Sequence, residues 1–299
     1  MRTYRYRLLN VFAESTFGGN PLCVFEDGSG LSDAEMQALA LQFNLSETTF
    51  ILPSTSATTR VRIFTPDFEM PFAGHPTLGT SQVVRALTGA GDSLTLEMRA
   101  GLVPVQARDN TWTLTAPGGA TPEVRRPALP AAAIAAQLGL GEQDLLSEPL
   151  WVDTGAHQLI VPLKSADAVR RARPDGARLA EWETNKAGRR AAYVFAFEGS
   201  ASDAAGDANG GQGIQRVLAR YFFVSSTGGV VEDPGTGSAC ANLGGWCAAT
   251  GRPLPARIRV AQGEQVRRPC FLGLEVTADR QVQVSGQVLE LGSGTIALP

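Results

Sequence analysis

Short runs in which apolar and polar residues alternate recur along most of the chain, and this period of two is typical of β-strands with one buried face. The first run, residues 1–10, already shows it, with Tyr4 and Tyr6 flanking Arg5. Further strands are predicted at residues 22–25, 48–52, 61–65, 94–98, 102–107, 111–116, 158–163, 193–197, 256–260, 272–277, 281–284 and 287–298. The chain is therefore predicted to be rich in strands.

A smaller number of segments has helical character. Ser32 and Glu35 form a capping box that opens a helix ending at Leu41 or Phe43, and Asn44 can close it. Other helices are predicted at residues 78–86, 131–138, 166–171 and 239–249, and an exposed loop rich in Gly, Ala, Asp and Ser at 200–213. Strands and helices mixed in this way indicate an α+β fold.

Two of the predicted helices follow polar loops that are related to each other, FAGHPT and DPGTGSA. Each loop comes after a strand that contains Arg and aromatic residues. When Phe64 and Phe223 of these strands are aligned, Gly74 falls in register with Asp233. A duplicated strand–loop–helix unit predicts two similar lobes whose helix N-termini face a shared cleft. Backbone N–H groups and the positive ends of the helix dipoles would suit a small carboxylate there.

The length of 299 residues favours two domains rather than one hydrophobic core. A stretch rich in Pro and Gly, residues 117–130, is the expected connection. We expect an N-terminal lobe of residues 1–117, to which the tail 286–299 returns, and a C-terminal lobe of residues 118–285.

Composition excludes several classes of function. The net charge of −3 gives no electrostatic footprint for nucleic acid or an anionic membrane surface. There is no run of about 18 apolar residues and no apolar signal segment, so neither a membrane span nor secretion is expected. The four cysteines form no Cys-x-x-Cys pair, so reduced thiols and a cytoplasmic location are expected. His75 and His157 are the two histidines, far apart in sequence, so no metal site is predicted.

The two polar loops carry the residue types that acid–base chemistry needs. In the first, Gly74 allows a close approach, His75 can exchange a proton near neutral pH, and Pro suits a first helical turn. In the second, Asp233 precedes two glycines, and Thr236 or Ser238 can cap the following helix. The glycine spacing does not match the dinucleotide fingerprint, so no nicotinamide or flavin cofactor is expected.

Two further residues allow alternative interpretations. Glu47, between apolar neighbours, is from local sequence a solvent-facing residue at the start of a strand, although a half-buried Glu in a cleft can shuttle protons. Cys240 and Cys247 lie on one face of an apolar helix, which favours core packing. The alternative is that Cys240, in the first turn, is a nucleophile whose pKa is lowered by the helix N-terminus.

Taken together, the motifs resemble those of the PhzF-like phenazine-biosynthesis family. The matching segments are Asn20-Pro21, Leu45-Ser46-Glu47-Thr48, Phe64-Thr65-Pro66, Glu69 with Pro71 to Thr77, and Asp233-Pro234 with Thr236 to Ala239. The resemblance covers essentially the whole chain. It implies two pseudo-symmetric lobes, each a mixed barrel-like sheet around a central helix, similar to diaminopimelate epimerase. The paired catalytic cysteines of that epimerase are replaced here by Gly74 and Asp233, which disfavours two-cysteine racemisation.

The resemblance also implies roles for individual residues. Glu47 would remove a proton from one carbon of the substrate and return it to another, with His75 and Asp233 as the other catalytic residues. Gly74, Thr77, Gly237 and Ser238 would bind the substrate, in part through its carboxylate. The resemblance implies that neither a metal nor an organic cofactor takes part. Relatives often have Gly-Gly where this chain has Ser285-Gly286, a departure near the expected pocket rim.

The favoured function is therefore a cofactor-independent isomerase for a small carboxylated metabolite, with dihydro-hydroxyanthranilate isomerisation in phenazine biosynthesis as the family example. One alternative is an epimerase or racemase that uses Cys240 or Asp233. Another is a metabolite-binding protein of the same fold without catalytic activity. A homodimer is expected from the resemblance alone.

Overall fold

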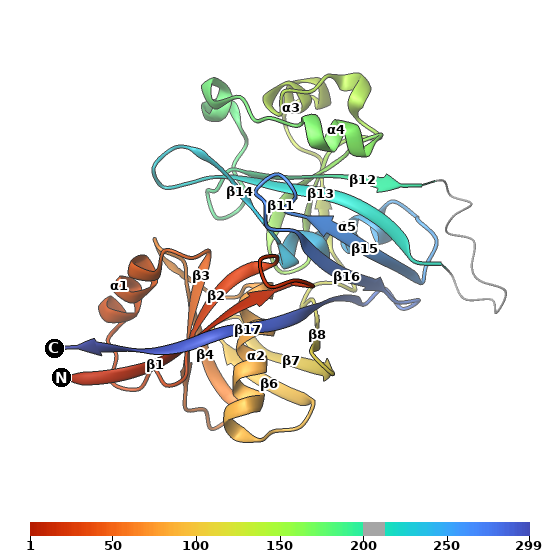
Figure 1. Ribbon diagram of the computed structural model, residues 1–299. Helices are drawn as coiled ribbons and strands as arrows, with labels where there is room; N and C mark the ends of the chain where they lie inside the picture. The colour runs from red at the N-terminus through yellow and green to blue at the C-terminus, as the bar shows by residue number, and fades with distance from the viewer. Residues whose placement is uncertain (200–212) are drawn as a thin grey trace. The chain divides into compact units, whose positions relative to one another are not determined.

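The computed structural model of the protein describes residues 1–199 and 213–299 (Figure 1). The loop predicted at 200–213 lies outside the described residues except for Gly213. The chain divides into two compact units, the first formed by Met1–Thr115 with Ser285–Pro299 and the second by Ala116–Val284.

The first unit is a closed mixed sheet with two helices. Strands β1 and β2 pair antiparallel, β2 and β3 parallel, β3 and β4 antiparallel, and β4 and β6 parallel. The antiparallel pairs β6–β7, β7–β8 and β17–β1 and the pairing of β17 with β8 complete an eight-stranded barrel. The elements are β1 (Arg2–Val11), β2 (Asn20–Phe25), α1 (Asp33–Phe43), β3 (Glu47–Leu52), β4 (Thr59–Phe64), β5 (Glu69–Met70), α2 (Gly74–Thr88), β6 (Ser93–Met98), β7 (Gly101–Arg108), β8 (Thr111–Thr115) and β17 (Val282–Leu298).

Helices α1 and α2 occupy different sides of this sheet. Helix α2 contacts β1, β2, β3, β4, β6 and β8, which places it inside the ring of strands (Figure 1). Helix α1 packs on β3 and β4 over an aromatic cluster that includes Phe25, Phe50 and Phe64. Its predicted ends are confirmed: Ser32 forms the capping box with Glu35, and Asn44 closes the helix with a φ of 50°.

The second unit repeats this order of pairing. Strands β10–β11, β12–β13 and β15–β16 pair antiparallel, while β11–β12 and β13–β15 pair parallel. The elements are β9 (Glu123–Arg125), α3 (Ala131–Gln137), η1 (Glu142–Asp144), β10 (Leu150–Asp153), β11 (His157–Pro162), α4 (Ala166–Arg171), η2 (Gly176–Glu181), β12 (Ala191–Glu198), β13 (Gln215–Val224), β14 (Val230–Asp233), α5 (Gly237–Ala249), β15 (Ala256–Gln262) and β16 (Cys270–Val276).

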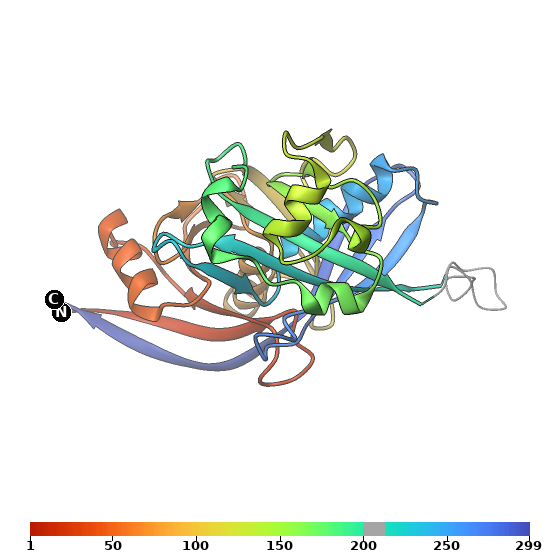
Figure 2. The ribbon, with the colours of Figure 1, turned by 90° about the horizontal axis from the view of Figure 1, so that it is seen from above.

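The second unit also has a helix on each face of its sheet. Helix α5 contacts β10, β11 and β16 and is almost entirely buried, as expected for a helix that is apolar on all sides. Helices α3 and α4 cover the opposite face through a cluster that includes Ile134, Val169 and Trp151. The view from above in Figure 2 shows these green helices in front of the strands of the unit.

Several predicted boundaries need correction. Strand β10 was not predicted, because its four residues carry no clear alternation. The two strands predicted at 281–284 and 287–298 are one continuous strand, β17. Helix α2 begins at Gly74 rather than near residue 78, because Pro76 fits a first helical turn.

The predicted register of the two polar loops is also wrong. A two-pronged ion pair joins the strand before each loop to the short strand that follows it: Arg62 donates to Glu69 with both distances 2.8 Å, and Arg220 donates to Glu232 at 3.0 and 2.7 Å. Such bidentate pairs are geometrically specific. They align Phe64 with Phe222.

In this alignment the hairpin between β13 and β14 is longer than the one between β4 and β5. Each helix then begins five residues after the glutamate of its ion pair. Gly74 therefore matches Gly237, and His75 matches Ser238. Asp233, the last residue of β14, has Met70 as its counterpart.

Glycine allows α5 to lie close to its sheet. A Cβ atom on Gly245 would lie 2.8 Å from Cγ2 of Thr154 and 3.0 Å from Cγ1 of Val152. Both neighbours are β-branched and therefore stiff at χ1.

We predict that Gly245→Ala destabilises the protein by about 1–3 kcal/mol through overpacking, although Gly→Ala within a helix is ordinarily stabilising by roughly 1 kcal/mol. Urea unfolding measures the change. Gly91→Ala is the control, because a Cβ there meets nothing within 4 Å. A variant at Gly245 as stable as wild type would contradict this close packing.

Candidate active site

The first unit brings Glu47 and His75 together. Glu47 is the first residue of β3, and His75 lies in the first turn of α2. Oε2 of Glu47 is 3.2 Å from Nε2 of His75, and the side chains are 15% and 5% exposed. The solvent-facing alternative for Glu47 is therefore wrong: this carboxylate is largely buried beside an imidazole.

His75 is a neutral group that can accept a proton at Nε2. Burial lowers the pKa of His75 to about 3, and a hydrogen bond to the backbone carbonyl of Pro21 acts in the opposite direction. Since Nε2 faces Glu47, the nitrogen that donates to Pro21 is Nδ1, which leaves the lone pair on Nε2. The contact with Glu47 is thus not an ion pair near neutral pH. A proton carried by Glu47 has an acceptor within hydrogen-bonding distance.

The start of α2 has no side-chain cap. Its N-cap residue is Ala73, and the N–H groups of Gly74 and His75 precede the first intrahelical hydrogen bond, from Thr77 N–H to the carbonyl of Ala73. The Thr77 side chain is fully buried, and its hydroxyl donates to the Ala73 carbonyl at 2.7 Å. Thr77 therefore supports the helix start, and its proton is already engaged.

In the second unit, a glutamine fixes the loop that carries Asp233. Gln262 donates to the carbonyl of Asp233 at 2.8 Å and to Oγ1 of Thr236 at 3.0 Å. The Thr236 hydroxyl donates in turn to Oδ2 of Asp233. Thr236 is the N-cap residue of α5, but its side chain makes no capping hydrogen bond. The predicted side-chain cap is wrong, because the Thr236 hydroxyl binds Asp233 instead.

Gly237 and Ser238 are the first two residues of α5, and Ser238 is only partly buried. The side-chain amide of Gln158 donates to Oγ of Ser238 at 3.0 Å. Sequence reasoning missed Gln158, the second residue of β11, and Gln262, the last residue of β15, because no local motif marks either of them.

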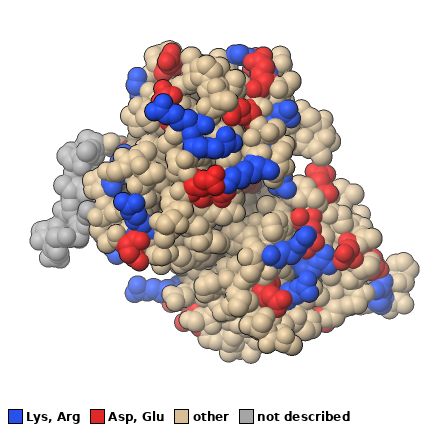
Figure 3. Space-filling model, turned by 180° about the vertical axis from the view of Figure 1, so that it is seen from behind, with Lys and Arg blue, Asp and Glu red and all other residues tan. Residues whose placement is uncertain are grey.

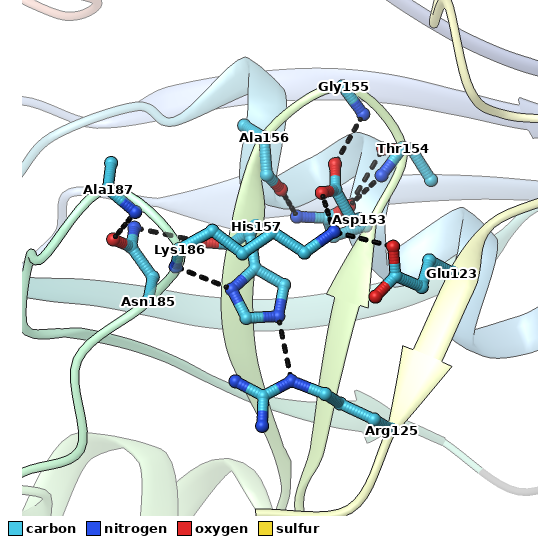
Figure 4. A network of polar contacts seen from close by, with 11 residues as sticks. Glu123, Arg125, Asp153, Thr154, Gly155, Ala156, His157, Asn185, Lys186 and Ala187 are labelled. Carbon is cyan, nitrogen blue, oxygen red and sulfur yellow. Dashed lines mark hydrogen bonds and ion pairs between the residues drawn. The ribbon is translucent and has the colours of Figure 1, made fainter.

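His157 has a structural role at the start of β11 (Figure 4). Its ring stacks on Trp151, with centroids 4.6 Å apart, and its two ring nitrogens lie 3.4 Å from Nε of Arg125 and 3.2 Å from the backbone nitrogen of Lys186. Burial lowers the pKa of His157, and the charges of Arg125 and Lys186 lower it further. His157 is thus held in place by neighbours within its own unit.

Cys240 does not have the properties of a nucleophile. It is completely buried in α5, and burial raises the pKa of its thiol, with a further contribution from Cys247. The alternative, a pKa lowered by the helix N-terminus, is therefore wrong. Core packing, the interpretation that the sequence favoured, agrees with the buried positions of both thiols.

Two other kinds of site can be tested on the described residues, a metal site and a membrane span. Among residues 1–199 and 213–299 no group of three His, Cys, Asp or Glu side chains could hold a metal ion. Within the same residues no helix is long and apolar enough to cross a membrane. On the face drawn in Figure 3, most Lys and Arg side chains lie beside Asp or Glu side chains.

Two solved structures share the fold of this chain. The chain matches a PhzF-family protein of Bacillus anthracis with a TM-score of 0.82, at 24% identity over 100% of both chains. It also matches a hydroxyproline epimerase of Agrobacterium vitis with a TM-score of 0.62, at 13% identity over 99% of this chain and 93% of the other. At these identities the likeness is one of fold.

Sequence comparison identifies the family. The model of phenazine biosynthesis-like proteins, PhzC-PhzF, matches residues 9–294, and the chain belongs to this family. An uncharacterized isomerase of Pasteurella multocida is 38% identical, over 99% of this chain and 95% of the relative. The trans-2,3-dihydro-3-hydroxyanthranilate isomerase of Pseudomonas chlororaphis is 32% identical, over 99% and 100%. The protein is an isomerase of this family.

The buried imidazole predicts a dependence of stability on pH. His75 has a lower pKa in the folded protein than the ordinary value of 6.5, so the unfolded chain binds the proton first as the pH falls. The free energy of unfolding should fall by up to about 1.4 kcal/mol per pH unit from about pH 6.5 down to about pH 3. His75→Gln should remove this contribution. Urea unfolding at several pH values measures the slope of the unfolding free energy against pH in wild type and in His75→Gln. Equal slopes in the two proteins would contradict a neutral, buried His75.

The buried thiol predicts an activity-neutral substitution. Cys240→Ala should lower stability by about 1 kcal/mol through loss of a small buried group, while the rate of isomerisation stays within about twofold of wild type. Thermal unfolding and a rate assay on the same preparation measure the two effects. Loss of the reaction in a folded Cys240→Ala protein would restore the thiol mechanism.

Proposed function

We propose that this isomerase moves a proton from one carbon to another within a small carboxylated metabolite, and that Glu47 carries the proton. The contact between Glu47 and His75 is the observation that carries the proposal. A largely buried carboxylate beside a neutral imidazole can act as a base and then as an acid without changing its position. No cofactor is needed for this chemistry.

The reaction proceeds in two balanced steps. In the first, a carboxylate oxygen of Glu47 takes the proton of a carbon next to the substrate's unsaturation, so that a C–H bond breaks and an O–H bond forms. In the second, the proton passes from Glu47 to another carbon of the same molecule as the double bond shifts, and in D₂O part of it exchanges for deuterium on Glu47 before this transfer. Nε2 of His75 accepts a hydrogen bond from the protonated Glu47 between the two steps and holds the carboxyl group in place.

The second unit supplies the other part of the site in this proposal. Asp233 assists proton handling, and the N–H groups of Gly237 and Ser238 at the start of α5 bind the substrate carboxylate with the Ser238 hydroxyl. Helix N-termini favour anions through these N–H groups and the dipole. The two units would then be the pseudo-symmetric lobes of one active site, with the substrate between them.

The dihydro-hydroxyanthranilate skeleton is the first substrate to test, because it is the named substrate of relatives that match the full chain. It offers a carboxylate and a ring C–H bond activated by unsaturation, which are the two features that the proposal uses. The expected homodimer also belongs to this proposal, since the family resemblance is its support.

Glu47→Gln should abolish proton transfer. We expect a loss of about 10²–10⁴-fold in the rate at which solvent deuterium enters trans-2,3-dihydro-3-hydroxyanthranilate and its product. Mass spectrometry measures the incorporation in D₂O, and circular dichroism checks the fold. Cys240→Ala serves as the matched control and should exchange like wild type.

Three other results of the exchange experiment would contradict the proposal. Exchange that survives in Glu47→Gln would contradict Glu47 as the proton carrier, and its loss in Cys240→Ala alone would favour a thiol enzyme. Binding of the compound by wild type without any exchange or conversion would contradict proton transfer on this substrate.

A further inference from the structure

Gln158 is a buried polar side chain without an assigned role. It is the second residue of β11 and is 5% exposed. Its amide nitrogen lies 3.0 Å from Oγ of Ser238 and 3.3 Å from the hydroxyl of Tyr221. Its amide oxygen accepts from Nδ2 of Asn242 at 2.7 Å.

The backbone N–H of Thr154, which can only donate, fixes the orientation of the Asn242 and Gln158 side-chain amides. The N–H of Thr154 and its hydroxyl both donate to Oδ1 of Asn242, at 2.9 and 2.8 Å. Oδ1 of Asn242 must therefore face Thr154, and its Nδ2 faces the carbonyl of Ala156 at 2.7 Å. Thr154 and Ala156 belong to the turn between β10 and β11 (Figure 4).

The orientation of the Asn242 amide also determines how Gln158 meets Ser238. Because Nδ2 of Asn242 donates to Gln158, the oxygen of the Gln158 amide points to Asn242 and its NH₂ group points to Ser238. The Ser238 oxygen is therefore an acceptor in this contact. Among the hydrogen bonds of the described residues, none uses the Ser238 hydroxyl as a donor. Its own proton is directed away from Gln158.

We propose that Gln158 is a positioning residue that makes the Ser238 hydroxyl a hydrogen-bond donor to the substrate. The inference rests on the proposed function and adds a requirement on the substrate. The group that meets Ser238 must be an acceptor, such as a carboxylate oxygen, and not an ammonium or amide N–H.

The first unit has the opposite arrangement at the corresponding position. His75 matches Ser238 in the alignment of the two units, and it donates to the carbonyl of Pro21, the second residue of β2. That hydrogen bond leaves His75 with an acceptor at Nε2, whereas the bond from Gln158 leaves Ser238 with a donor. The substrate is thereby oriented, with its acidic end toward α5 and the carbon that loses a proton toward Glu47.

The test compares Gln158→Glu, Gln158→Met and Ser238→Ala, with Gln137→Met as a matched control for the loss of a buried glutamine (4% exposed) elsewhere in the second unit. Calorimetry with anthranilate as the probe measures carboxylate binding, and deuterium exchange on trans-2,3-dihydro-3-hydroxyanthranilate gives KM and kcat. The carboxylate introduced by Gln158→Glu would accept a hydrogen bond from the Ser238 hydroxyl. The hydroxyl proton would then point toward residue 158 and no longer toward the substrate.

Gln158→Glu should weaken anthranilate binding and raise KM by about tenfold to a hundredfold, the size of a lost hydrogen bond to a charged group. Gln158→Met should have a smaller effect in the same direction, and Gln137→Met none beyond about twofold. In a Ser238→Ala background the effect of Gln158→Met should fall within about twofold, because the two residues act through one contact.

Wild-type affinity in a folded Gln158→Met protein, or an undiminished effect of Gln158→Met in the Ser238→Ala background, would overturn the positioning role. Glu47→Gln separates this from the proposed function. It should abolish exchange and retain anthranilate binding, whatever the Gln158 variants show. If Gln158→Glu does not fold, the Gln158→Met pair decides the result.

Discussion

Strand β2 holds both members of the Glu47–His75 pair. Its residue Leu22 pairs with Glu47 across the parallel β2–β3 ladder, and the carbonyl of its neighbour Pro21 accepts from the His75 ring. The carboxylate and the imidazole are therefore positioned by adjacent residues of one strand. A closed barrel has no edge at which this strand can slip. This constraint fixes the distance on which the proposed proton transfer depends.

In the proposed mechanism the two units use the same scaffold for opposite chemistry. A bidentate Arg–Glu pair precedes each central helix, and the second residue of each helix is bound by the second residue of a strand. In the first unit this arrangement leaves an acceptor on His75, and in the second we propose that it leaves a donor on Ser238. Catalysis by groups that are already oriented needs little reorganisation during the reaction. The difference between the units suits a substrate with two different ends.

Sequence reasoning worked where the signal is local. The capping box at Ser32, the close of α1 at Asn44 and most strands follow from neighbouring residues. It failed where the signal is distant. Alignment of Phe64 with Phe223 by equal spacing to the loops did not account for the longer hairpin in the second unit. The Arg–Glu pairs show that Phe64 matches Phe222. Gln158 lies in a strand of apolar residues, and its polar partners come from other elements, so no local pattern marks it.

The proposed site joins groups from both units on one molecule, and a crystal structure with bound anthranilate tests this directly. We expect one ligand whose carboxylate lies about 3 Å from Oγ of Ser238 and whose ring faces the carboxylate of Glu47. A ligand that binds at α5 with Glu47 remote from its ring, or one bound outside both groups, would contradict it.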